Sequence, residues 1–334
     1  MAHQGVLRFR ADNTFTIVQF TDTHWNNGEP ADEQTRALMA RVLDLEQPDL
    51  VFLTGDVIEG SGARDPAQSW RAAVAPIEAR EIPWAAVLGN HDDEGTLDRK
   101  QLMAVQQSCA WCLSEPGPAD VSGVGNYVLR VRAAGGDAIA LALYCLDSNG
   151  YAETEVGGYG WIRRDQIDWF LEVARGLRDE HDAPLPALAF FHIPLPEYDE
   201  TWQFSTCHGH KHEAVCCPRI NTGFFAALHQ AGGVMGTFVG HDHINDFEGE
   251  RYGIRLCYGR ASGYQTYGRD GFLRGARVIR WAEGERSFRT WLRLEDGSVV
   301  NNLPRHEPEF QRPECTVPTL ADNTTFSSQF RSSH

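Results

Sequence analysis

Short apolar runs that end in small or polar residues recur along the chain. They are rich in β-branched or aromatic residues and are apolar on both faces, which is typical of strands buried in a sheet. Five such runs are FTIVQFTD, DLVFLTGD, PWAAVLGN, PALAFFH and VMGTFVG. The pattern therefore predicts five buried strands.

Helical patterns lie between several of these runs. Residues 31–45 and residues 164–178 each place their apolar side chains on one stripe. A third helix is predicted to begin near residue 221, with Asn221 or Thr222 as its N-cap. Because strands alternate with helices, the sequence predicts an α/β core.

The remaining strand patterns suggest an antiparallel part. YVLRVR and AIALALYCLD are neighbours along the chain, and IRLCYG, GARVIRWAE and SFRTWLRLED follow after Gly253. From Asn301 onward, Pro, Asn, Ser and charged residues dominate. With no internal repeat and no linker, we expect one domain with two sheets over residues 1–300 and an irregular tail over residues 301–334.

The composition narrows the class of protein. Of the 334 residues, 42% are hydrophobic, which is typical of a globular protein with a sizeable core. No run approaches the roughly 18 consecutive apolar residues of a membrane-spanning helix. The start, MAHQGVLRFRADNTF, has no basic region followed by an apolar stretch, so no signal peptide is predicted. We expect a cytoplasmic protein that does not bind membranes.

The cysteines are interpreted as ordinary thiols. There are eight, sparse and unevenly spread, unlike the framework of a small secreted domain. Cys109 and Cys112 form a close pair, but a redox or zinc role would need a second pair or a thioredoxin-like strand before it. Packing thiols or a local disulfide are therefore favoured.

The charge balance restricts the partners. Thirty basic and 46 acidic residues give a formal charge of −16. A long polyanion such as duplex DNA would be repelled, so stable binding of nucleic acid is not expected. An anionic substrate would need a strong local positive centre.

Polar residues follow each of the five buried strands. In open α/β sheets the carboxyl ends of strands line the ligand crevice, so these side chains are expected to share one rim. Their mixture of carboxylate, amide and imidazole groups suits Mn, Fe, Zn or Mg rather than copper or iron–sulfur clusters. The residues are Asp22, His24, Asp56, Asn90, His91, His192, His241 and His243.

Each motif taken alone has an ordinary explanation. Asp22 and His24 could cap a turn, and His192 could be a satisfied core histidine. The pair Gly89-Asn90 is also a good turn signal. Only the occurrence of all the motifs at strand ends favours a metal site over these alternatives.

The order of the motifs resembles the calcineurin-like metallophosphoesterases. The resemblance rests on Asp-x-His, Gly-Asp, Gly-Asn-His-Asp, a lone His and Gly-His-x-His, and it extends from TDTHW to about RGARVIRW. GYGWIRRDQIDWF, FFHIPLPEY, GHDHINDF and CYGRASGYQTYG are most similar to the purple-acid-phosphatase-related branch of plants and fungi. The resemblance implies a β-sandwich of two mixed sheets flanked by helices, in four αββα layers.

The same resemblance implies the ligands of two metal ions, divalent or mixed-valence, with Mn, Fe or Zn favoured over Mg. Asp22, His24 and His243 would hold the first ion, and Asp56 would bridge both. The second ion would be completed by Asn90, His192 and His241. His91 would bind no metal but would face the leaving group.

Two positions depart from the purple enzymes. They carry Tyr three residues after the bridging Asp, where this chain has Glu59, and they lack the histidine found here as His24. A tyrosinate-to-iron colour is therefore not expected, and the resemblance does not imply a requirement for Fe(III). Glu59 could support a ligand from outside the metal shell, but a solvated loop carboxylate is the favoured interpretation.

Several further residues are candidates for supporting or substrate contacts. Asp242 is expected to orient a neighbouring histidine, and Trp25 could stack on a leaving group. In the loop 201–221, His208, His210 and His212 could contact substrate or another metal, although a polar cap loop is favoured. Residues past the last metal motif could frame a pocket or pack in the core: Tyr258, Arg260, Tyr264 and Tyr267.

These expectations together predict a hydrolase of small phosphate mono- or diesters. A metal-bridging hydroxide would attack phosphorus, and His91 would assist departure of the alkoxide. The ions would give the site the positive charge that the rest of the chain lacks. A non-catalytic metal-binding scaffold and a phosphodiesterase or nuclease acting on nucleotides are the alternatives.

Overall fold

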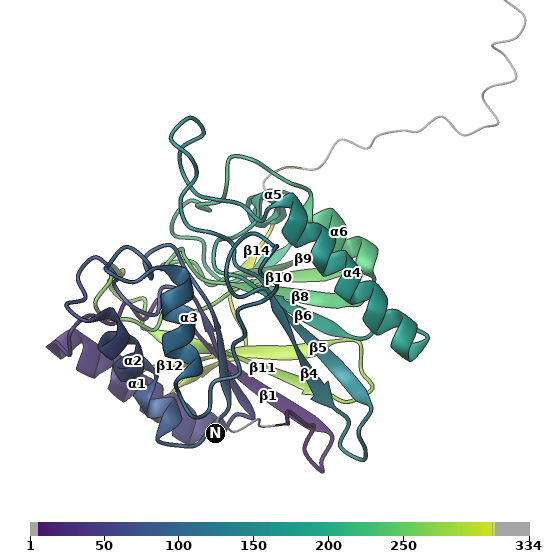
Figure 1. Cartoon of the computed structure of the whole chain (residues 1–334), viewed down its shortest axis with the longest axis horizontal. Helices are drawn as coiled ribbons and strands as arrows, with labels where there is room; N and C mark the ends of the chain where they lie inside the picture. The colour runs from purple at the N-terminus through teal and green to yellow at the C-terminus, as the bar shows by residue number, and fades with distance from the viewer. Residues whose placement is uncertain (1–5, 309, 311–334) are drawn as a thin grey trace, which may run out of the picture.

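Two β-sheets lie face to face at the centre of the molecule, and helices cover both outer surfaces (Figure 1). The computed structural model describes residues 6–308 and 310. The predicted arrangement of two mixed sheets flanked by helices is confirmed.

The six-stranded sheet combines three parallel strands with an antiparallel extension. The parallel part holds the first three buried strands of the sequence, and β11 pairs antiparallel with β1. In spatial order the strands are β13 (Val299–Val300), β12 (Phe288–Leu294), β11 (Gly275–Ala282), β1 (Thr14–Phe20), β2 (Leu50–Thr54) and β3 (Trp84–Val87).

The eight-stranded sheet has a parallel centre and antiparallel edges. Strands β5, β6, β8 and β10 run parallel, while β4 pairs antiparallel with β5, as the sequence predicts. The spatial order is β14 (Arg305–His306), β7 (Cys207–His208), β9 (Glu248–Arg251), β10 (Ile254–Tyr258), β8 (Val234–Val239), β6 (Ala187–Phe190), β5 (Ile139–Cys145) and β4 (Tyr127–Arg132).

Three helices cover each sheet. On the six-stranded sheet lie α1 (Pro30–Glu46), α2 (Pro66–Glu78) and α3 (Arg99–Gln107), and on the eight-stranded sheet lie α4 (Arg164–His181), α5 (Pro196–Phe204) and α6 (Phe224–Ala231). The helices predicted over 31–45 and 164–178 are therefore present as α1 and α4.

The predicted N-cap of the third helix is wrong. Gly223 caps α6, in the left-handed conformation with φ 79°. The Asn221 side chain accepts the Gly223 N–H and donates to Glu197, and the Thr222 hydroxyl donates to the carbonyl of Ile162. Because tertiary contacts use both polar side chains, neither is left to cap the helix.

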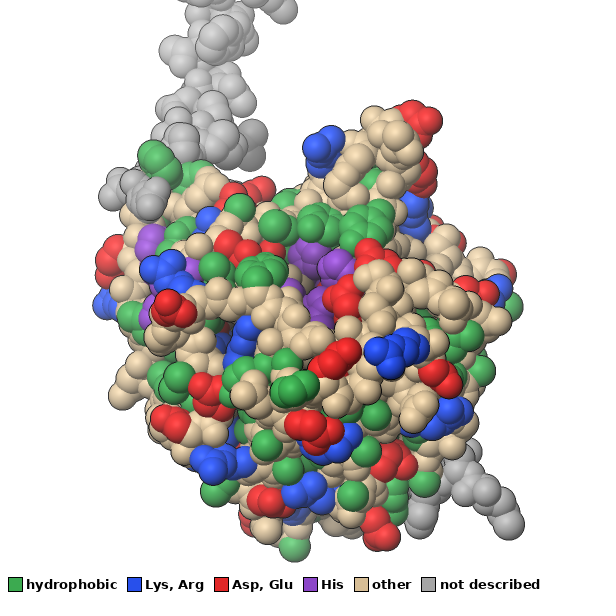
Figure 2. Space-filling model, turned by 90° about the vertical axis from the view of Figure 1, so that its left-hand side faces the viewer, with side chains coloured by type: hydrophobic (Ala, Val, Ile, Leu, Met, Phe, Trp, Pro, Cys, Tyr) green, Lys and Arg blue, Asp and Glu red, His purple; other side chains and the backbone are tan. Residues whose placement is uncertain are grey.

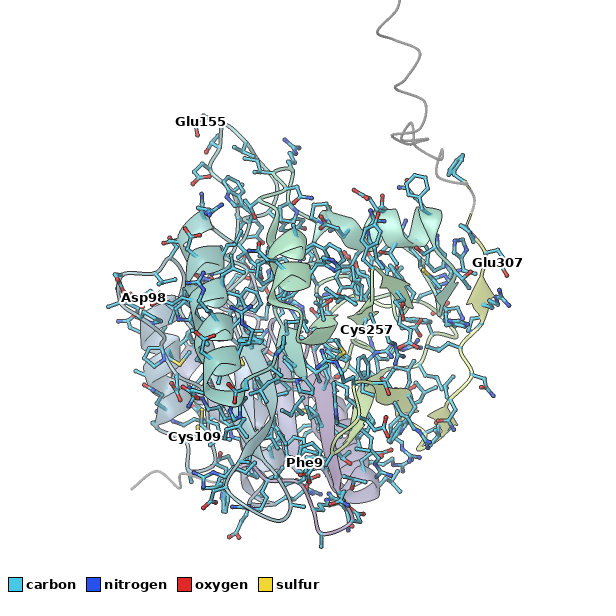
Figure 3. All side chains as sticks on the ribbon, turned by 90° about the vertical axis from the view of Figure 1, so that its right-hand side faces the viewer. Phe9, Asp98, Cys109, Glu155, Cys257 and Glu307 are labelled. Carbon is cyan, nitrogen blue, oxygen red and sulfur yellow. The ribbon has the colours of Figure 1, made fainter. Side chains whose placement is uncertain are left out.

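The core consists of three layers of apolar side chains, one between the sheets and one under each set of helices. Between the sheets, the Phe190 ring stacks on Phe52, with centroids 4.0 Å apart, and on Phe238 at 5.3 Å. Figure 3 shows how densely side chains fill this space, with Cys257 in the interior and Glu155 at the tip of a projecting loop. This packing gives the strand ends a rigid base.

The seven cysteines in the described part of the chain are all free thiols.

The tail that was predicted to be irregular contains one short strand in its described part. This strand, β14, pairs with β7, while residues 309 and 311–334 lie outside the described residues. No helix in the described part of the chain is both long and apolar enough to cross a membrane.

Candidate metal centre

The loops that follow the parallel strands are joined to one another through their backbones. The Asp22 N–H donates to the carbonyl of Gly55 at 3.1 Å, and the Gly240 N–H donates to the carbonyl of His192 at 3.1 Å. The His241 N–H donates to the Asp22 carboxylate at 3.0 Å, which connects the two sheets. The parallel strands therefore deliver their polar residues to one shared edge.

Four of the predicted site residues hold a left-handed backbone conformation. The φ angles are 52° for Asp22, 44° for His24, 48° for Asp56 and 78° for His241. This region costs a residue other than glycine on the order of 1–3 kcal/mol, and such residues cluster at functional sites. The fold therefore carries strain where it places these side chains.

Glycines in the motifs allow the loops to approach closely. A Cβ atom on Gly89 would overlap Oδ1 and the backbone nitrogen of Asp56, and one on Gly240 would overlap the Thr21 hydroxyl. Glycine in Gly-Asn-His-Asp and Gly-His-x-His is thus required by contact between loops rather than by a turn alone.

The predicted ligands form two buried clusters that share one carboxylate. In each cluster the ligand atoms lie within 4.8 Å of one another. The first cluster contains Asp22, His24, Asp56 and His243, and the second contains Asp56, His192 and His241. The Asn90 Oδ1 atom lies 3.2 Å from Nε2 of His192, which adds an amide oxygen to the second cluster.

Hydrogen bonding fixes which atoms of the second cluster carry lone pairs. The Nδ1–H of His192 donates to the carbonyl of Thr54 at 2.7 Å, so its Nε2 is the unprotonated nitrogen of the neutral ring. That Nε2 lies 3.1 Å from Oδ2 of Asp56 and 3.2 Å from Oδ1 of Asn90. Three electron-pair donors then face one another without a proton between them, an arrangement that a cation stabilises.

The first cluster is arranged in the same way. The Nδ1–H of His24 donates to Glu59 at 2.9 Å, which leaves its Nε2 3.3 Å from Nε2 of His243 and 3.7 Å from Oδ2 of Asp56. Within the described residues, Asp56 Oδ2 and His241 Nε2 are buried and have no hydrogen-bond partner. Buried polar atoms are almost always satisfied, so the Asp56 oxygen fits the requirement for a metal ligand, while His241 presents Nδ1 to the second cluster, 3.2 Å from Nε2 of His192.

The pKa values of these groups are shifted because carboxylates and imidazoles lie buried and close together. Burial alone would raise the pKa of Asp56, but His192 and His24 hold it well below its usual range. Burial opposes protonation of His192, yet the Asp56 carboxylate raises the pKa of this histidine to about 9. Burial and the neighbouring His192 lower the pKa of His241 to about 3. The Asp56 carboxylate therefore favours a positive charge beside His192, which a bound cation would supply to the neutral ring.

Outer contacts orient the imidazole ligands. Glu59 was interpreted as a solvated loop carboxylate, and that interpretation is wrong because its Oε2 accepts the His24 proton. The Thr266 hydroxyl hydrogen-bonds to Nδ1 of His243 at 2.7 Å. Partners of this kind fix the tautomer of a metal-binding histidine.

Asp92 is a supporting residue that sequence reasoning missed. Its fully buried carboxylate accepts the backbone N–H groups of Asp56, Ile58 and Gly89 at 2.7–3.1 Å. Burial and the adjacent Asp56 raise its pKa to about 6. Asp92 thus holds the loops of β2 and β3 together behind the bridging carboxylate, and its place in Gly-Asn-His-Asp was the available signal.

His91 lies beside the clusters and belongs to a different network. Its Nδ1–H donates to Glu94 at 2.8 Å, and Glu94 also accepts the hydroxyl proton of Tyr151 at 2.8 Å. The Tyr151 oxygen accepts the side-chain N–H of Asn90 at 3.1 Å. These hydrogen bonds turn the Asn90 oxygen toward His192, and Nε2 of His91 has no hydrogen-bond partner among the described residues. Neither Glu94 nor Tyr151 was predicted.

Several candidates for substrate contact are placed elsewhere. Trp25 is only 1% exposed and packs in the core under α1 and α2, so it has no free face for a leaving group. Tyr258 is fully buried, and its hydroxyl donates to Asp242 at 2.6 Å. Asp242 also accepts the Cys216 N–H and therefore orients no histidine, contrary to the prediction.

The loop histidines do not join the two clusters. His208 lies exposed in β7, and His210 donates from its ring to Asp246. Arg260, which was expected to frame the pocket, is buried against the same Asp246 carboxylate. These three residues therefore contribute no atom to either cluster.

Tyrosines frame the opening of the site. The Tyr267 ring stacks on His243 with centroids 4.2 Å apart, and Tyr159 meets His241 edge-on at 4.3 Å. Figure 2 shows histidine side chains gathered in a hollow, bordered by hydrophobic and acidic side chains. Of these tyrosines, the sequence suggested only Tyr267.

The comparisons with known proteins agree with this geometry. A family model described as calcineurin-like phosphoesterase matches residues 15–245. An Arabidopsis thaliana protein named probable inactive purple acid phosphatase 29 is 37% identical, over 88% of this chain and 86% of its own length. The Saccharomyces cerevisiae protein named Phosphatase DCR2 is 34% identical over 90% of this chain, which spans 56% of the yeast protein.

Solved structures share the fold at low sequence identity. A dimetal phosphatase from Danio rerio superposes with a TM-score of 0.56 and 14% identity, covering 83% of this chain and 98% of that one. A purple acid phosphatase from yellow lupin gives a TM-score of 0.54 and 14% identity, covering 87% of this chain and 53% of that one. At such identities the likeness concerns the fold alone.

Proposed function

The chain belongs to the calcineurin-like phosphoesterase family, and from this premise we propose that it is a metal-dependent hydrolase of small phosphate esters. The observation that carries the proposal is the pair of buried clusters that meet at Asp56. Unprotonated nitrogens and carboxylate oxygens face one another there, and the buried Oδ2 atom of Asp56 has no hydrogen-bond partner in the described part of the chain.

The proposed metal sites follow the two clusters. Asp22, His24 and His243 would hold one ion, and Asn90, His192 and His241 would hold the other, with Asp56 shared. Mn, Fe and Zn suit this mixture of imidazole and oxygen ligands. Such a pair, when bound, supplies a water of lowered pKa and offsets charge on the phosphoryl oxygens.

His91 has the geometry of a proton donor for the leaving group. Glu94 accepts the proton on Nδ1, so only Nε2 can face a substrate, and the ring is one-third exposed. Protonated at Nε2, His91 would give its proton to the departing alkoxide oxygen. Because it sits outside both clusters, it can act without releasing a metal.

The substrate would be a small mono- or diester rather than nucleic acid. The chain carries a formal charge of −16, and three carboxylates lie near the opening: Glu59, Glu94 and Glu213. Within the described residues none of these forms an ion pair with lysine or arginine. A long polyanion would meet repulsion on the way to the clusters.

A non-catalytic scaffold is the second candidate, since Arabidopsis relatives are named probable inactive purple acid phosphatases. Against it stands the full set of seven predicted ligands, together with His91. A protein kept only as a scaffold has no need of strained backbone at four of these residues.

Hydrolysis assays with metal analysis would separate the two candidates. The protein would be purified, stripped with a chelator and reloaded with Mn²⁺, Fe²⁺ or Zn²⁺. Turnover of 4-nitrophenyl phosphate and bis(4-nitrophenyl) phosphate would then be measured beside bound metal. We expect turnover that disappears with the chelator and returns with metal. Two bound ions without turnover of either ester would favour the scaffold.

A further inference from the structure

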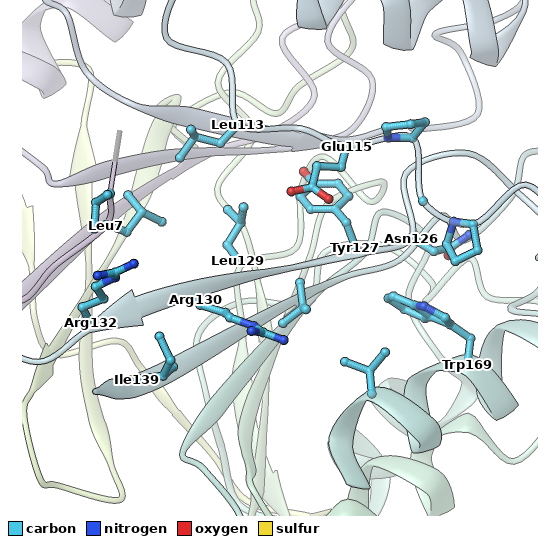
Figure 4. A pocket seen from close by; sticks show the side chains of 16 residues that line it. Leu7, Leu113, Glu115, Asn126, Tyr127, Leu129, Arg130, Arg132, Ile139 and Trp169 are labelled. Atoms are coloured by element: carbon cyan, nitrogen blue, oxygen red, sulfur yellow. The ribbon is translucent and has the colours of Figure 1, made fainter. Parts of the chain in front are cut away.

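A second cavity, of about 370 Å³, lies apart from the metal-ligand clusters. Its volume is within the range of small-molecule sites, and none of the proposed metal ligands lines it. A cavity of about 780 Å³ is a different feature, a groove along the edge strand β4 bordered by Leu129 and Trp169 (Figure 4). Unlike this groove, the smaller cavity combines an apolar wall with the buried cation Arg260.

The apolar wall comes from the sheet edge and the segment after it. It consists of Leu273, Leu292, Leu294, Val300 and Leu303. These side chains lie on the loop after β10, on β12, on β13 and just beyond β13. A ligand with a hydrocarbon portion would remove this wall from water.

The buried cation is Arg260, whose side chain is only 5% exposed. Its Nε donates to the carbonyl of Leu273 at 2.7 Å, its Nη1 donates to Asp246, and its guanidinium lies over the Phe272 ring. Nη2 makes no hydrogen bond to any described residue. Because Arg260 lines the cavity, this donor is available to a ligand.

The rest of the polar lining carries charges of both signs. His210, His212, the exposed Arg269 and the exposed Asp270 lie around the same space. Burial lowers the pKa of His212, and Arg269 and His210 lower it further, which reports positive potential at that ring. The Asp246 oxygens already accept from Nη1 of Arg260 and from the backbone N–H of His210, so they do not compete with a ligand for Nη2 of Arg260.

We propose that this cavity binds a small organic monocarboxylate. The carboxylate would accept from Nη2 of Arg260 and pair with Arg269, and its hydrocarbon part would lie on Leu292 and Leu303. The planar guanidinium matches the geometry of a carboxylate. The site accounts for Arg260 and the loop histidines, which the metal centre does not use.

The test is isothermal titration with three probes that separate charge from hydrocarbon. Hexanoate carries both features, acetate only the charge and 1-hexanol only the chain. We expect one hexanoate per chain, with acetate and 1-hexanol at least about tenfold weaker. Acetate binding as tightly as hexanoate, or no heat with millimolar hexanoate, would overturn the proposal.

Substitutions test whether hexanoate binds in this cavity. Arg269→Ala should weaken hexanoate about fivefold, because an exposed charge is lost, and Leu303→Trp should block it by filling the cavity. Arg175→Ala removes an exposed arginine on α4 and should change nothing. The titration is repeated with Asp56→Asn, because a carboxylate bound at the metal ions would lose affinity there. Hexanoate affinity that falls in Asp56→Asn but not in Arg269→Ala or Leu303→Trp refutes the cavity as the site.

Discussion

Two regions of this molecule carry histidines at alternate positions, and they behave differently. His241 and His243 follow the buried parallel strand β8, whereas His208, His210 and His212 lie on the two-residue strand β7 and in the loop after it. In both regions one residue separates neighbouring histidines. Only the first pair joins clusters of other ligand atoms.

Backbone conformation explains part of the difference. In an extended chain, residues i and i+2 point to the same side. His241 instead adopts φ 78°, and the chain turns so that His241 enters the second cluster and His243 the first. None of the three loop histidines has a positive φ angle, and the positive φ between His208 and His210 belongs to Gly209. One spacing therefore supplies ligands to two different centres.

The groups that surround each histidine explain the rest of the difference between the two regions. At the strand ends, imidazole nitrogens face carboxylate oxygens or one another, and the groups are buried. In the loop, His210 donates to Asp246 and packs beside His212 against Phe272. Among the described residues, no group of three converging ligand atoms includes a loop histidine. Position at the end of a buried strand, not spacing, distinguishes the two regions.

The sharpest test of the comparison is Asp56→Asn, for which we expect the largest effect. The carboxylate belongs to both clusters, so the substitution should weaken both metal sites. Turnover should fall by more than roughly 10³-fold, since even an outer partner of a metal ligand contributes 10–100-fold. Mass spectrometry measures the metal content of the variant, and ester hydrolysis measures its turnover. Asp270→Asn, in the loop between β10 and β11, is the control and should retain both ions.

His91→Ala should separate chemistry from metal binding. Both ions should stay bound, while turnover falls by roughly 10²–10⁴-fold, the range for a proton-transfer group. Alkyl phosphates should lose more than 4-nitrophenyl phosphate, because an alkoxide needs the proton most. Glu94→Gln should reduce turnover in the wild type but cost less when added to His91→Ala, because its effect through His91 is then already lost. An undiminished loss in the double variant would show that Glu94 acts only through Tyr151 and Asn90.

Glu59→Gln should have a smaller effect, confined to the first cluster. Glu59 holds the Nδ1 proton of His24, and a glutamine can offer its N–H there instead and turn the ring. Affinity for one ion should fall by about 10–100-fold, while the other stays bound. Competition with a metal chelator measures this. Glu172→Gln on α4 is the matched control, and equal loss of both ions would contradict the assignment.

The sequence predicted the strands and the polar residues at their ends because both depend on local pattern. An apolar run that stops at Asp22 or Asp56 marks a buried strand and the rim that follows it. The four-layer fold is confirmed, and the eight rim residues lie together as expected. Their roles as metal ligands and proton donor stay predictions until metal is measured.

The supporting residues depended on contacts that no local pattern contains. Tyr151 reaches Glu94 across 57 positions of sequence, and Glu59 reaches His24 across 35. Trp25 follows a predicted ligand directly, yet its side chain turns into the core under α1. Neighbours of a ligand are therefore poor guides to the substrate pocket, since tertiary packing decides where they point.

The smallest effect is expected for His212→Ala, which probes the loop region directly. His212 makes no side-chain hydrogen bond within the described residues and is partly exposed against Phe272. Its removal should leave both metal ions bound and turnover within about twofold. Stability should change by no more than about 0.5 kcal/mol, as for most surface substitutions. Metal analysis, ester hydrolysis and denaturant unfolding check the three expectations. Loss of one equivalent of metal would mean that the loop contributes a ligand, and the distinction between strand-end and loop histidines would then fail.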